Sequence, residues 1–331
     1  MLRSHSSIPD LDTLRASGKR AVAAALAAIE TARGSTRLTA LLDAAAAAAR
    51  AHVLGLTGPP GVGKSTLTNA LVRQARAAGE TMAVLAVDPS SRRSGGALLG
   101  DRARIQTDPE DGGVFVRSMA ARDRLGGLSD DAVAAVVLLR AIYDRVIVET
   151  VGVGQSEADI DLVADTVVLC IQPASGDSLQ FMKAGVMELP DIIVVTKADM
   201  ADIARRAAAD VAGALSLGGG SQPDRWQVPV IRLSAATGEG LDSFTAAVNS
   251  HKTYLATDGR TRARRGAQEQ RWVEEAIRVR FGTQGLARAR HLPRASGGPF
   301  TQEAALTAHL GADPQDRDQG PEDGAHRSRG V

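Results

Sequence analysis

The segment GPPGVGKS at residues 58–65 is the feature that most restricts how this chain folds. An apolar run at 53–57 precedes it, and a helix-like stretch at 66–78 follows it. Between a strand and a helix, a glycine-rich loop of this pattern points its backbone N–H groups at phosphate oxygens. The helix that follows adds the positive end of its dipole. The sequence therefore predicts a phosphate-binding loop at the centre of an α/β fold.

Each loop residue has an expected role. The residues expected to surround the phosphates are Gly58, Pro59, Pro60, Gly61, Val62, Gly63, Lys64, Ser65 and Thr66. Lys64 is expected to reach the β- and γ-phosphates, and the hydroxyl of Ser65 to face Mg²⁺. The chain has only five lysines against many arginines, and two of the five lie in nucleotide motifs. Lys183 lies outside those motifs and is a candidate functional residue, because a chain that prefers arginine can keep lysine where a compact ammonium is needed; an exposed lysine kept by composition drift is the alternative.

Seven short apolar runs alternate with helical patterns through the middle of the chain. The runs lie at 53–57, 82–87, 114–116, 146–149, 166–171, 192–196 and 230–233. Continuous β-branched runs separated by helices are typical of a parallel sheet covered on both faces. The predicted helices are 12–31, 36–51, 65–78, 130–143, 202–215 and 241–248, with a further helical pattern over about 244–280. The expected fold is a three-layer P-loop NTPase domain with a mostly parallel sheet and helical N- and C-terminal extensions.

The same patterns suggest four segments. Residues 1–50 are expected to form a helical extension, 51–248 the nucleotide domain, 249–290 a helical arm, and 291–331 a partly disordered tail. The stretch 260–290 is rich in arginine with glutamates between. It is expected to be a solvated helix face, with an acidic partner surface as the alternative.

Composition excludes several classes of function. Lys plus Arg total 39 and Asp plus Glu total 38, so a net charge of +1 gives no overall reason to bind nucleic acid. No apolar run approaches the roughly 20 residues of a membrane span, and the first ten residues lack the apolar core of a secretory signal. One cysteine, Cys170, suits a reducing compartment, so a cytoplasmic protein with Cys170 in its core is expected. The six histidines are scattered without ligand-like spacing and are expected to be solvated or capping residues.

Two later loops predict that the base is guanine. The sequence TKAD at 196–199 follows the apolar run 192–195, and its Asp199 can accept hydrogen bonds from the ring N–H and the exocyclic amino group of guanine. Adenine lacks both donors, so a mismatch would leave a charged acceptor unpaired. Lys197 is expected to pack its stem along the base. A supporting loop after 230–233 is expected to read the guanine carbonyl oxygen through Ser234, Ala235 and Ala236.

Carboxylates near the ends of other strands suggest a Mg²⁺ site and a hydrolysis switch. ETVG at 149–152 ends the run 146–148, where most switch GTPases have Asp-x-x-Gly; Glu149 therefore replaces the usual aspartate. Gly152 can offer its N–H to the γ-phosphate. Gln155 can orient the attacking water, with a surface residue of the switch loop as the alternative. Asp88 and Asp101 are further candidates for holding Mg²⁺, directly or through water, or for capping turns.

Four segments together resemble the MeaB/ArgK/MMAA family of P-loop GTPases. They are VDPSS at 87–91, LLGDRAR at 98–104, ETVGVGQSE at 149–157 and QPASGDSLQFMKAG at 172–185, and the resemblance spans about 10–285. It implies a GTPase chaperone of an adenosylcobalamin-dependent acyl-CoA mutase, with methylmalonyl-CoA mutase the usual client. Such proteins gate cobalamin delivery, protect or reactivate the mutase, and are typically homodimers.

By position, the resemblance implies that Ser65, Asp88, Asp101 and Glu149 surround Mg²⁺. It also implies that 172–185, which contains Lys183, couples the nucleotide state to the mutase. The chain departs from the family at three places: Thr196 replaces the usual Asn, Ala174 stands where Gly is frequent, and the tail after about 290 is unusual.

Two alternatives compete with the mutase chaperone. A nickel metallochaperone GTPase of the hydrogenase or urease maturation type would want a His-rich tract or a cysteine-containing metal site, and one Cys with six scattered His argues against it. A protein or amino-acid kinase would need an acceptor site and a base, and the sequence points to neither.

Overall fold

The structure, a computed structural model, describes residues 8–89, 105, 107–108, 110–121, 128–150, 159–173, 190–218 and 224–312, apart from the side chains of 88–89, 121 and 217–218. Seven strands form one sheet within this part of the chain. They are β1 (His52–Thr57), β2 (Met82–Pro89), β3 (Val114–Ala121), β4 (Arg145–Thr150), β5 (Thr166–Ile171), β6 (Ile192–Val195) and β7 (Val230–Arg232). Each strand coincides with one predicted apolar run, although β3 continues to Ala121.

The sheet order is β3-β2-β4-β1-β5-β6-β7, and every pairing is parallel. The predicted three-layer α/β fold is therefore confirmed. β1 lies between β4 and β5, where the chain changes the direction in which it adds strands. In open α/β sheets, ligands bind beyond the carboxyl ends of the strands at such a point. The loop after β1 begins there.

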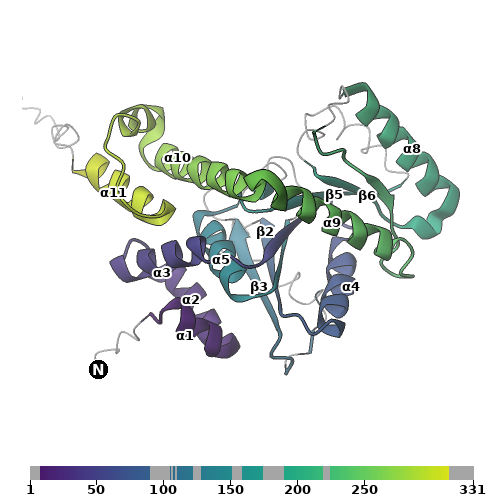
Figure 1. The fold of residues 1–331 in the computed structure, drawn as a ribbon, viewed down its shortest axis with the longest axis horizontal. Coiled ribbons are helices and arrows are strands. Elements are labelled where there is room, and N and C mark those ends of the chain that lie inside the picture. Colours follow the sequence, from purple (N-terminus) through teal and green to yellow (C-terminus); the bar gives the residue numbers. More distant parts are fainter. Residues whose placement is uncertain are drawn as a thin grey trace, which may run out of the picture.

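Helices cover both faces of the sheet (Figure 1). α4 (Lys64–Ala77) and α9 (Leu241–Ala256) pack on one face, against alternate strand residues such as Leu56, Ile147 and Val168. α5 (Asp130–Ile142) and α8 (Ala201–Gly218) cover the other face, against Val148 and Ile193 respectively. Strands buried on both faces explain why their sequences are continuously apolar instead of alternating.

The N-terminal arm consists of α1 (Leu11–Ala16), α2 (Gly18–Thr31) and α3 (Thr36–Ala47), and it packs against α5. The prediction of one helix over 12–31 was wrong, because the chain breaks at Ser17 and Gly18 adopts a φ of +72°. A left-handed glycine cannot continue a helix, and the periodicity of apolar residues on either side hides this break. The second predicted helix ends at Ala47, four residues before residue 51.

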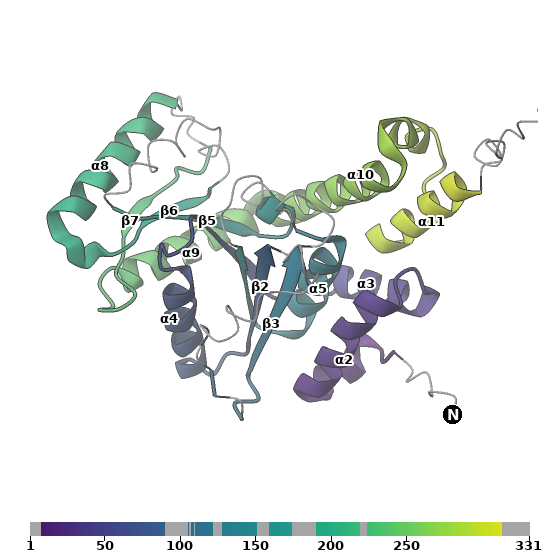
Figure 2. The same ribbon diagram turned by 180° about the vertical axis from the view of Figure 1, so that it is seen from behind.

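The C-terminal arm is a long helix with a second helix returned against it. α10 (Arg260–Ala289) extends from the sheet to α11 (Pro299–Gly311), and α11 lies beside α3; Figure 2 shows the same arrangement from behind, with α8 at the opposite end of the molecule. The chain within α10 turns at Gly282, where φ is +72°. The sequence pattern did not predict α11, which lies in the segment expected to be a tail.

Asp43 joins the two arms. Its carboxylate, on α3, accepts hydrogen bonds from the backbone N–H groups of Phe300 and Thr301 at 2.9 and 3.1 Å, and from the Thr301 hydroxyl at 2.5 Å. These N–H groups belong to the first turn of α11, which has no side-chain cap of its own. A carboxylate from the other end of the sequence therefore satisfies donors that a helix start leaves without partners.

A chain of buried polar groups ties the start of β1 and β5 to α9. His52 Nε2 lies 2.7 Å from Thr166 Oγ1, which lies 2.7 Å from His251 Nδ1, and His251 Nε2 lies 3.3 Å from the carboxylate of Asp191. The expectation that the histidines are solvated or capping was wrong for His52 and His251, since both are largely buried. A pattern of scattered positions does not show that two of them meet across the sheet.

The direction of the hydrogen bonds in this polar chain follows from the tautomers of its two histidines. If His251 donates from Nε2 to Asp191, its Nδ1 must accept from the Thr166 hydroxyl. Thr166 then accepts from His52 Nε2–H. Both rings are neutral in this arrangement, which agrees with burial lowering the pKa of His52 to about 4 and also lowering the pKa of His251.

Arginines of α10 secure the arm to the sheet. Arg265 donates to both carboxylate oxygens of Asp165, at 2.8 and 2.7 Å, and Arg264 bonds Asp191 and Asp161. Burial alone would raise the pKa of Asp165, but the bonds and charge of Arg265, together with His52 and the Val53 N–H, outweigh it and the pKa lies below its usual value. The expectation of a solvated helix face was wrong for these two arginines, because the helix turns them inward onto aspartates.

Candidate functional site

The phosphate-binding loop follows β1 and leads into α4 at the carboxyl edge of the sheet. Gly58 has a φ of +135°, and a Cβ there would lie 2.2 Å from the backbone oxygen of Cys170 on β5. Gly61 and Gly63 also have positive φ, and Gly63 is the N-cap of α4. Only glycine combines this backbone with so close an approach to the neighbouring strand. The loop is therefore fixed to β5 at its first residue.

Lys64 is the first residue of α4 and its side chain is buried. Its ammonium donates to the carbonyl oxygens of Gly58 and Pro59, at 2.6 and 3.0 Å. The lysine thus spans its own loop and presents its charge inside the loop's curve. Cys170 lies beneath it, and burial raises the pKa of the thiol to about 12. This confirms the prediction that Cys170 is a small buried core residue.

Glu149 is the penultimate residue of β4, and its side chain is held by α4. Ser65 Oγ donates to one carboxylate oxygen at 2.7 Å, and Thr68 Oγ1 donates to the other at 3.0 Å. Glu149 is 6% exposed and Thr68 is fully buried. The structure therefore brings together the hydroxyl and the carboxylate that the sequence assigned to Mg²⁺, with a second hydroxyl that it did not assign.

The two loops assigned to guanine follow adjacent strands, β6 and β7. The Ala198 N–H donates to the carbonyl of Leu233 at 3.2 Å, and the Leu233 N–H donates to Val195 at 2.9 Å, so the loops are bonded to each other. Ser234 begins the second loop and is buried, while Ala236 is exposed. Its turn closes through bonds from Ser234 N to Glu239 O and from Gly238 N to Ser234 O.

Thr196 occupies the position where related GTPases most often have asparagine. Its N–H and its hydroxyl both donate to the carbonyl of Ile171 at the end of β5, at 2.9 and 3.1 Å. The next residue, Lys197, has a left-handed φ of +53° and donates from Nζ to Gln172 at 2.9 Å. Asp199 follows in the short helix Ala198–Met200 with its carboxylate exposed. The threonine thus fixes the loop to β5, and Asp199 stays accessible to a ligand.

Several predicted residues lie outside the described residues. These are Asp101, Gly152, Gln155 and Lys183, together with Ala174 and the side chain of Asp88. The described part of the site therefore comprises the phosphate loop, Glu149 and the two loops assigned to guanine.

Three contacts escaped the sequence reasoning. Thr68 was missed although it lies three residues after Ser65 and so shares a helix face with it, a signal that was available. The approach of the Cys170 carbonyl to Gly58 and the bond from Lys197 to Gln172 depend on strands that are distant in sequence. No local pattern reveals such pairs.

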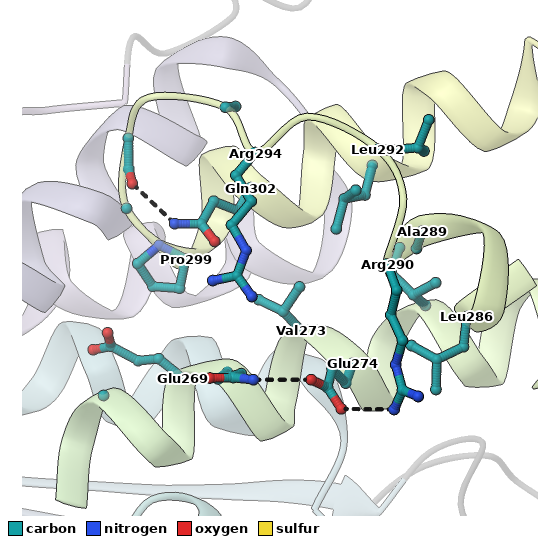
Figure 3. A pocket seen from close by; sticks show the side chains of 17 residues that line it. Glu269, Val273, Glu274, Leu286, Ala289, Arg290, Leu292, Arg294, Pro299 and Gln302 are labelled. Carbon is teal, nitrogen blue, oxygen red and sulfur yellow. Dashed lines mark hydrogen bonds and ion pairs between the residues drawn. The ribbon is translucent and has the colours of Figure 1, made fainter. Parts of the chain in front are cut away.

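A separate cavity of about 320 Å³ lies in the C-terminal arm, between α10 and α11 (Figure 3). Val273 and Leu286 are among its apolar lining residues, and Glu274 and Arg290 also line it and pair with each other, with 3.7 Å between the charged atoms. None of the residues assigned to phosphate or guanine lines it. The cavity belongs to the arm and not to the nucleotide edge of the sheet.

Comparison with known proteins agrees with the geometry. The family model described as "Methylmalonyl Co-A mutase-associated GTPase MeaB" matches residues 22–287. A Caulobacter vibrioides protein named as a GTPase is 37% identical over 282 residues, covering 82% of this chain and 86% of that protein. The GTPase ArgK of Escherichia coli is 37% identical over 228 residues, covering 67% and 68% of the two chains.

Two further likenesses extend the comparison. The mouse protein "Methylmalonic aciduria type A homolog, mitochondrial" is 38% identical over 227 residues, covering 68% of this chain and 54% of that protein. The crystal structure of a LAO/AO transport system kinase has a TM-score of 0.66 at 27% identity, covering 94% of this chain and all of that one. None of the described helices is both long and apolar enough to cross a membrane. From its phosphate loop, its fold and these relatives, the chain belongs to the MeaB family of P-loop GTPases and hydrolyses GTP.

Proposed function

We propose that this GTPase is a chaperone of an adenosylcobalamin-dependent acyl-CoA mutase, most directly methylmalonyl-CoA mutase. In this proposal it gates delivery of the cofactor and protects or reactivates the mutase. The single observation that carries the proposal is the family match over 22–287, whose description names association with that mutase. The name of the mouse relative, which refers to methylmalonic aciduria, supports the same client.

The proposed nucleotide site uses the residues already placed at the carboxyl edge. The loop from Gly58 to Thr66 binds the phosphates of GTP or GDP through its amides, and Lys64 moves its charge from the loop carbonyls onto the phosphate oxygens. Asp199 accepts from the guanine edge, Lys197 covers the base, and the loop from Ser234 to Ala236 reads the carbonyl oxygen. Asp199 is exposed at the same edge of the sheet, which suits it to receive a base.

The donor set fits Mg²⁺. Ser65 and Glu149 offer a hydroxyl and a carboxylate 2.7 Å apart, and oxygen ligands of this kind are what Mg²⁺ prefers. When bound, Mg²⁺ supplies charge that stabilises the phosphate oxygens during transfer to water. Asp88 and Asp101 complete the set in the proposal. Gly152 and Gln155 keep the switch and water-orienting roles that the family resemblance implies, and Lys183 the role of linking nucleotide to client.

The proposal also covers the assembly and the organisation of the chain. We assign 51–248 to the GTPase domain, 1–50 and 249–290 to arms, and 291–331 to a C-terminal segment that contains α11. The protein acts as a homodimer in the cytoplasm in this proposal. The nickel metallochaperone of the hydrogenase or urease maturation type is the alternative, and the family match over 22–287 favours the mutase client over it.

The decisive experiment combines binding and turnover. Purified protein is mixed with methylmalonyl-CoA mutase in the presence of GDP, of a non-hydrolysable GTP analogue, or of neither, and complexes are separated by size. GTP turnover is then measured with and without the mutase. We expect a complex whose amount depends on the nucleotide, and a slow basal rate that the mutase raises at least about 10-fold.

Lys64→Ala is the matched control, since it removes the ammonium that contacts the phosphates. It is expected to abolish turnover both alone and with the mutase. An unchanged rate together with no complex, tested against several cobalamin-dependent mutases, would count decisively against the chaperone role. Sedimentation of the protein alone measures whether it is a dimer.

A further inference from the structure

Both oxygens of the Glu149 carboxylate are held by hydroxyl groups of one helix. Ser65 and Thr68 lie three residues apart on α4, so their side chains share a face. Ser65 donates to Oε1 at 2.7 Å and Thr68 to Oε2 at 3.0 Å. Thr68 has no exposed surface, whereas Ser65 is partly exposed toward the nucleotide edge. The two hydroxyls are therefore not equivalent.

The Thr68 contact is not the ordinary behaviour of a threonine inside a helix. Such a residue commonly bonds the carbonyl four positions earlier in its own helix. Thr68 instead reaches from α4 to the end of β4. Its hydroxyl provides a buried carboxylate oxygen with a donor, and an unpaired oxygen at that depth would be costly.

The hydrogen bond from Thr68 is important because residue 149 is a glutamate. Glu149 stands where most switch GTPases have aspartate, and it has one more rotatable bond. A free carboxylate on this longer stem would occupy several rotamers and orientations. Mg²⁺ requires nearly ideal octahedral geometry, and groups behind its ligands set the orientation of those ligands. A donor fixed on Oε2 leaves Oε1 facing the hydroxyl of Ser65.

We propose that Thr68 is a positioning residue, which holds Glu149 so that one chosen carboxylate oxygen faces the Mg²⁺ and γ-phosphate side of the site. The proposal rests on the proposed function of Ser65 and Glu149 at Mg²⁺. When Ser65 turns its hydroxyl to the metal, Thr68 still holds the glutamate through Oε2. The extra length of Glu149 is thus compensated by a hydroxyl one helical turn beyond the phosphate loop.

The test compares two substitutions at one position. Thr68→Val removes the hydroxyl and keeps a β-branched shape, while Thr68→Ser keeps the hydroxyl and removes a methyl group. Binding of a fluorescent GDP analogue is measured against Mg²⁺ concentration and again in EDTA. Steady-state GTP turnover gives kcat and KM at saturating Mg²⁺, and thermal unfolding reports folding.

We expect Thr68→Val to shift the Mg²⁺ midpoint for GDP binding upward by about 10- to 100-fold, the usual effect of losing a group that orients a metal ligand. Binding in EDTA should stay unchanged. The value of kcat should fall with little change in KM, and Thr68→Ser should recover the wild-type Mg²⁺ midpoint to within about threefold. If Thr68→Val does not fold, Thr68→Cys replaces it, because a thiol of similar size is a poor donor.

Thr81→Val is the matched control. It removes a bond from a threonine hydroxyl to a carboxylate, Thr81 to Asp144 at 2.6 Å, before the start of β2 at the opposite edge of the sheet. The Mg²⁺ midpoint of this variant should equal that of the wild type. Equal midpoints for Thr68→Val and the wild type, or equal losses in Thr68→Ser and Thr68→Val, would overturn the positioning role. If wild-type GDP binding itself ignores Mg²⁺, the proposed metal site fails instead.

Discussion

Asp199 is exposed at the end of β6, in a loop that is bonded to the neighbouring guanine loop. Asp199→Asn should reduce GTP affinity about 10- to 100-fold, because a bond to a charged acceptor is lost and an amide donor faces the guanine amino group. Xanthine carries a carbonyl in place of that amino group and can accept from the new amide. The variant should therefore prefer xanthosine nucleotides.

Competition between GDP, XDP and ADP for a fluorescent nucleotide measures this preference. Asp202→Asn, in the exposed first turn of α8, is the control and should leave the order of affinities unchanged. Retention of GDP preference in Asp199→Asn, or equal turnover of ATP and GTP by the wild type, would contradict the assignment of guanine to this loop.

Gly58 is the residue at which the phosphate loop meets β5. Gly58→Ala would place a Cβ 2.2 Å from the Cys170 backbone oxygen, with φ at +135°. Because that neighbour is backbone, relief requires moving a strand, so we expect a loss of at least about 2 kcal/mol in the free energy of unfolding. Urea unfolding measures it.

Gly61→Ala separates backbone strain from collision. Gly61 also has a positive φ, but a Cβ there would meet no atom within 4 Å. The free energy of unfolding of this variant should fall by only about 1 kcal/mol, which is the strain of a left-handed conformation. A larger loss at Gly61 than at Gly58 would show that contact with β5 is not what requires glycine.

At the scale of elements, α10 is secured by charged pairs that differ in exposure. Asp165 has a side chain only 1% exposed and receives two bonds from Arg265. Arg265→Met should lower the free energy of unfolding by about 3 kcal/mol, since it leaves a buried carboxylate with weaker pairing. The Val53 N–H still donates to Asp165 at 2.8 Å in this variant. We therefore expect a loss of stability at the lower end of the range for broken buried ion pairs.

Arg271→Met is the control on the same helix. Arg271 is 51% exposed where it pairs with Asp161, and exposed pairs contribute little. Its loss should stay within about 0.5 kcal/mol. Denaturant unfolding compares the two variants, and equal losses would mean that α10 is not secured through Asp165.

The polar chain between β1, β5 and α9 predicts sensitivity to acid. Burial lowers the pKa of His52 to about 4, against 6.5 in the unfolded chain, although Asp165 opposes the shift. The unfolded state therefore binds more protons between these values, and the free energy of unfolding falls as the pH falls from 6.5 to 4. The loss from this residue should reach about 3 kcal/mol, and the lowered pKa of His251 acts in the same direction.

Urea unfolding at several pH values between 7.5 and 4.5 measures this slope. His52→Gln keeps a neutral donor for Thr166 and removes the titrating group, so its stability should fall less steeply over the same interval. The comparison uses only the slopes of the free energy of unfolding against pH, so a difference in stability at pH 7.5 does not affect it. Identical slopes would show that His52 is not the group that takes up the proton.

For the whole molecule, the two ends of the sequence meet at the start of α11. Asp43→Ala removes every bond from α3 to the N–H groups of Phe300 and Thr301. Loss of a helix cap of this kind should lower the free energy of unfolding by about 1–2 kcal/mol and speed amide exchange in the first turn of α11. Hydrogen exchange measured along the chain tests both the site and the extent of the change.

Asp12→Ala is the control for the arms, because the Asp12 side chain is 93% exposed and pairs with Arg15, three residues away. It should leave exchange in α11 unchanged. Exchange that rises equally in both variants would show that the arms loosen together without a specific role for Asp43.

The sequence by itself determined the elements that depend on interactions among neighbouring residues. A glycine-rich loop between an apolar run and a helix fixes the phosphate loop, and continuous β-branched runs fix seven parallel strands, because steric limits and burial act over a few residues. The positions of Lys64 at the start of α4, and of Glu149 and Asp199 near the ends of β4 and β6, followed from the same patterns. Local periodicity failed at Gly18, where one residue breaks a helix without altering the apolar spacing.

Only the tertiary structure decided which distant groups share a site. The Cys170 carbonyl against Gly58, the two histidines around Thr166, and Asp43 at the start of α11 all join segments separated by many residues. Sequence spacing holds no information about such pairs, since sheet order and helix docking create them. Burial then gives them their energy, because a polar group inside the protein must find its partner there.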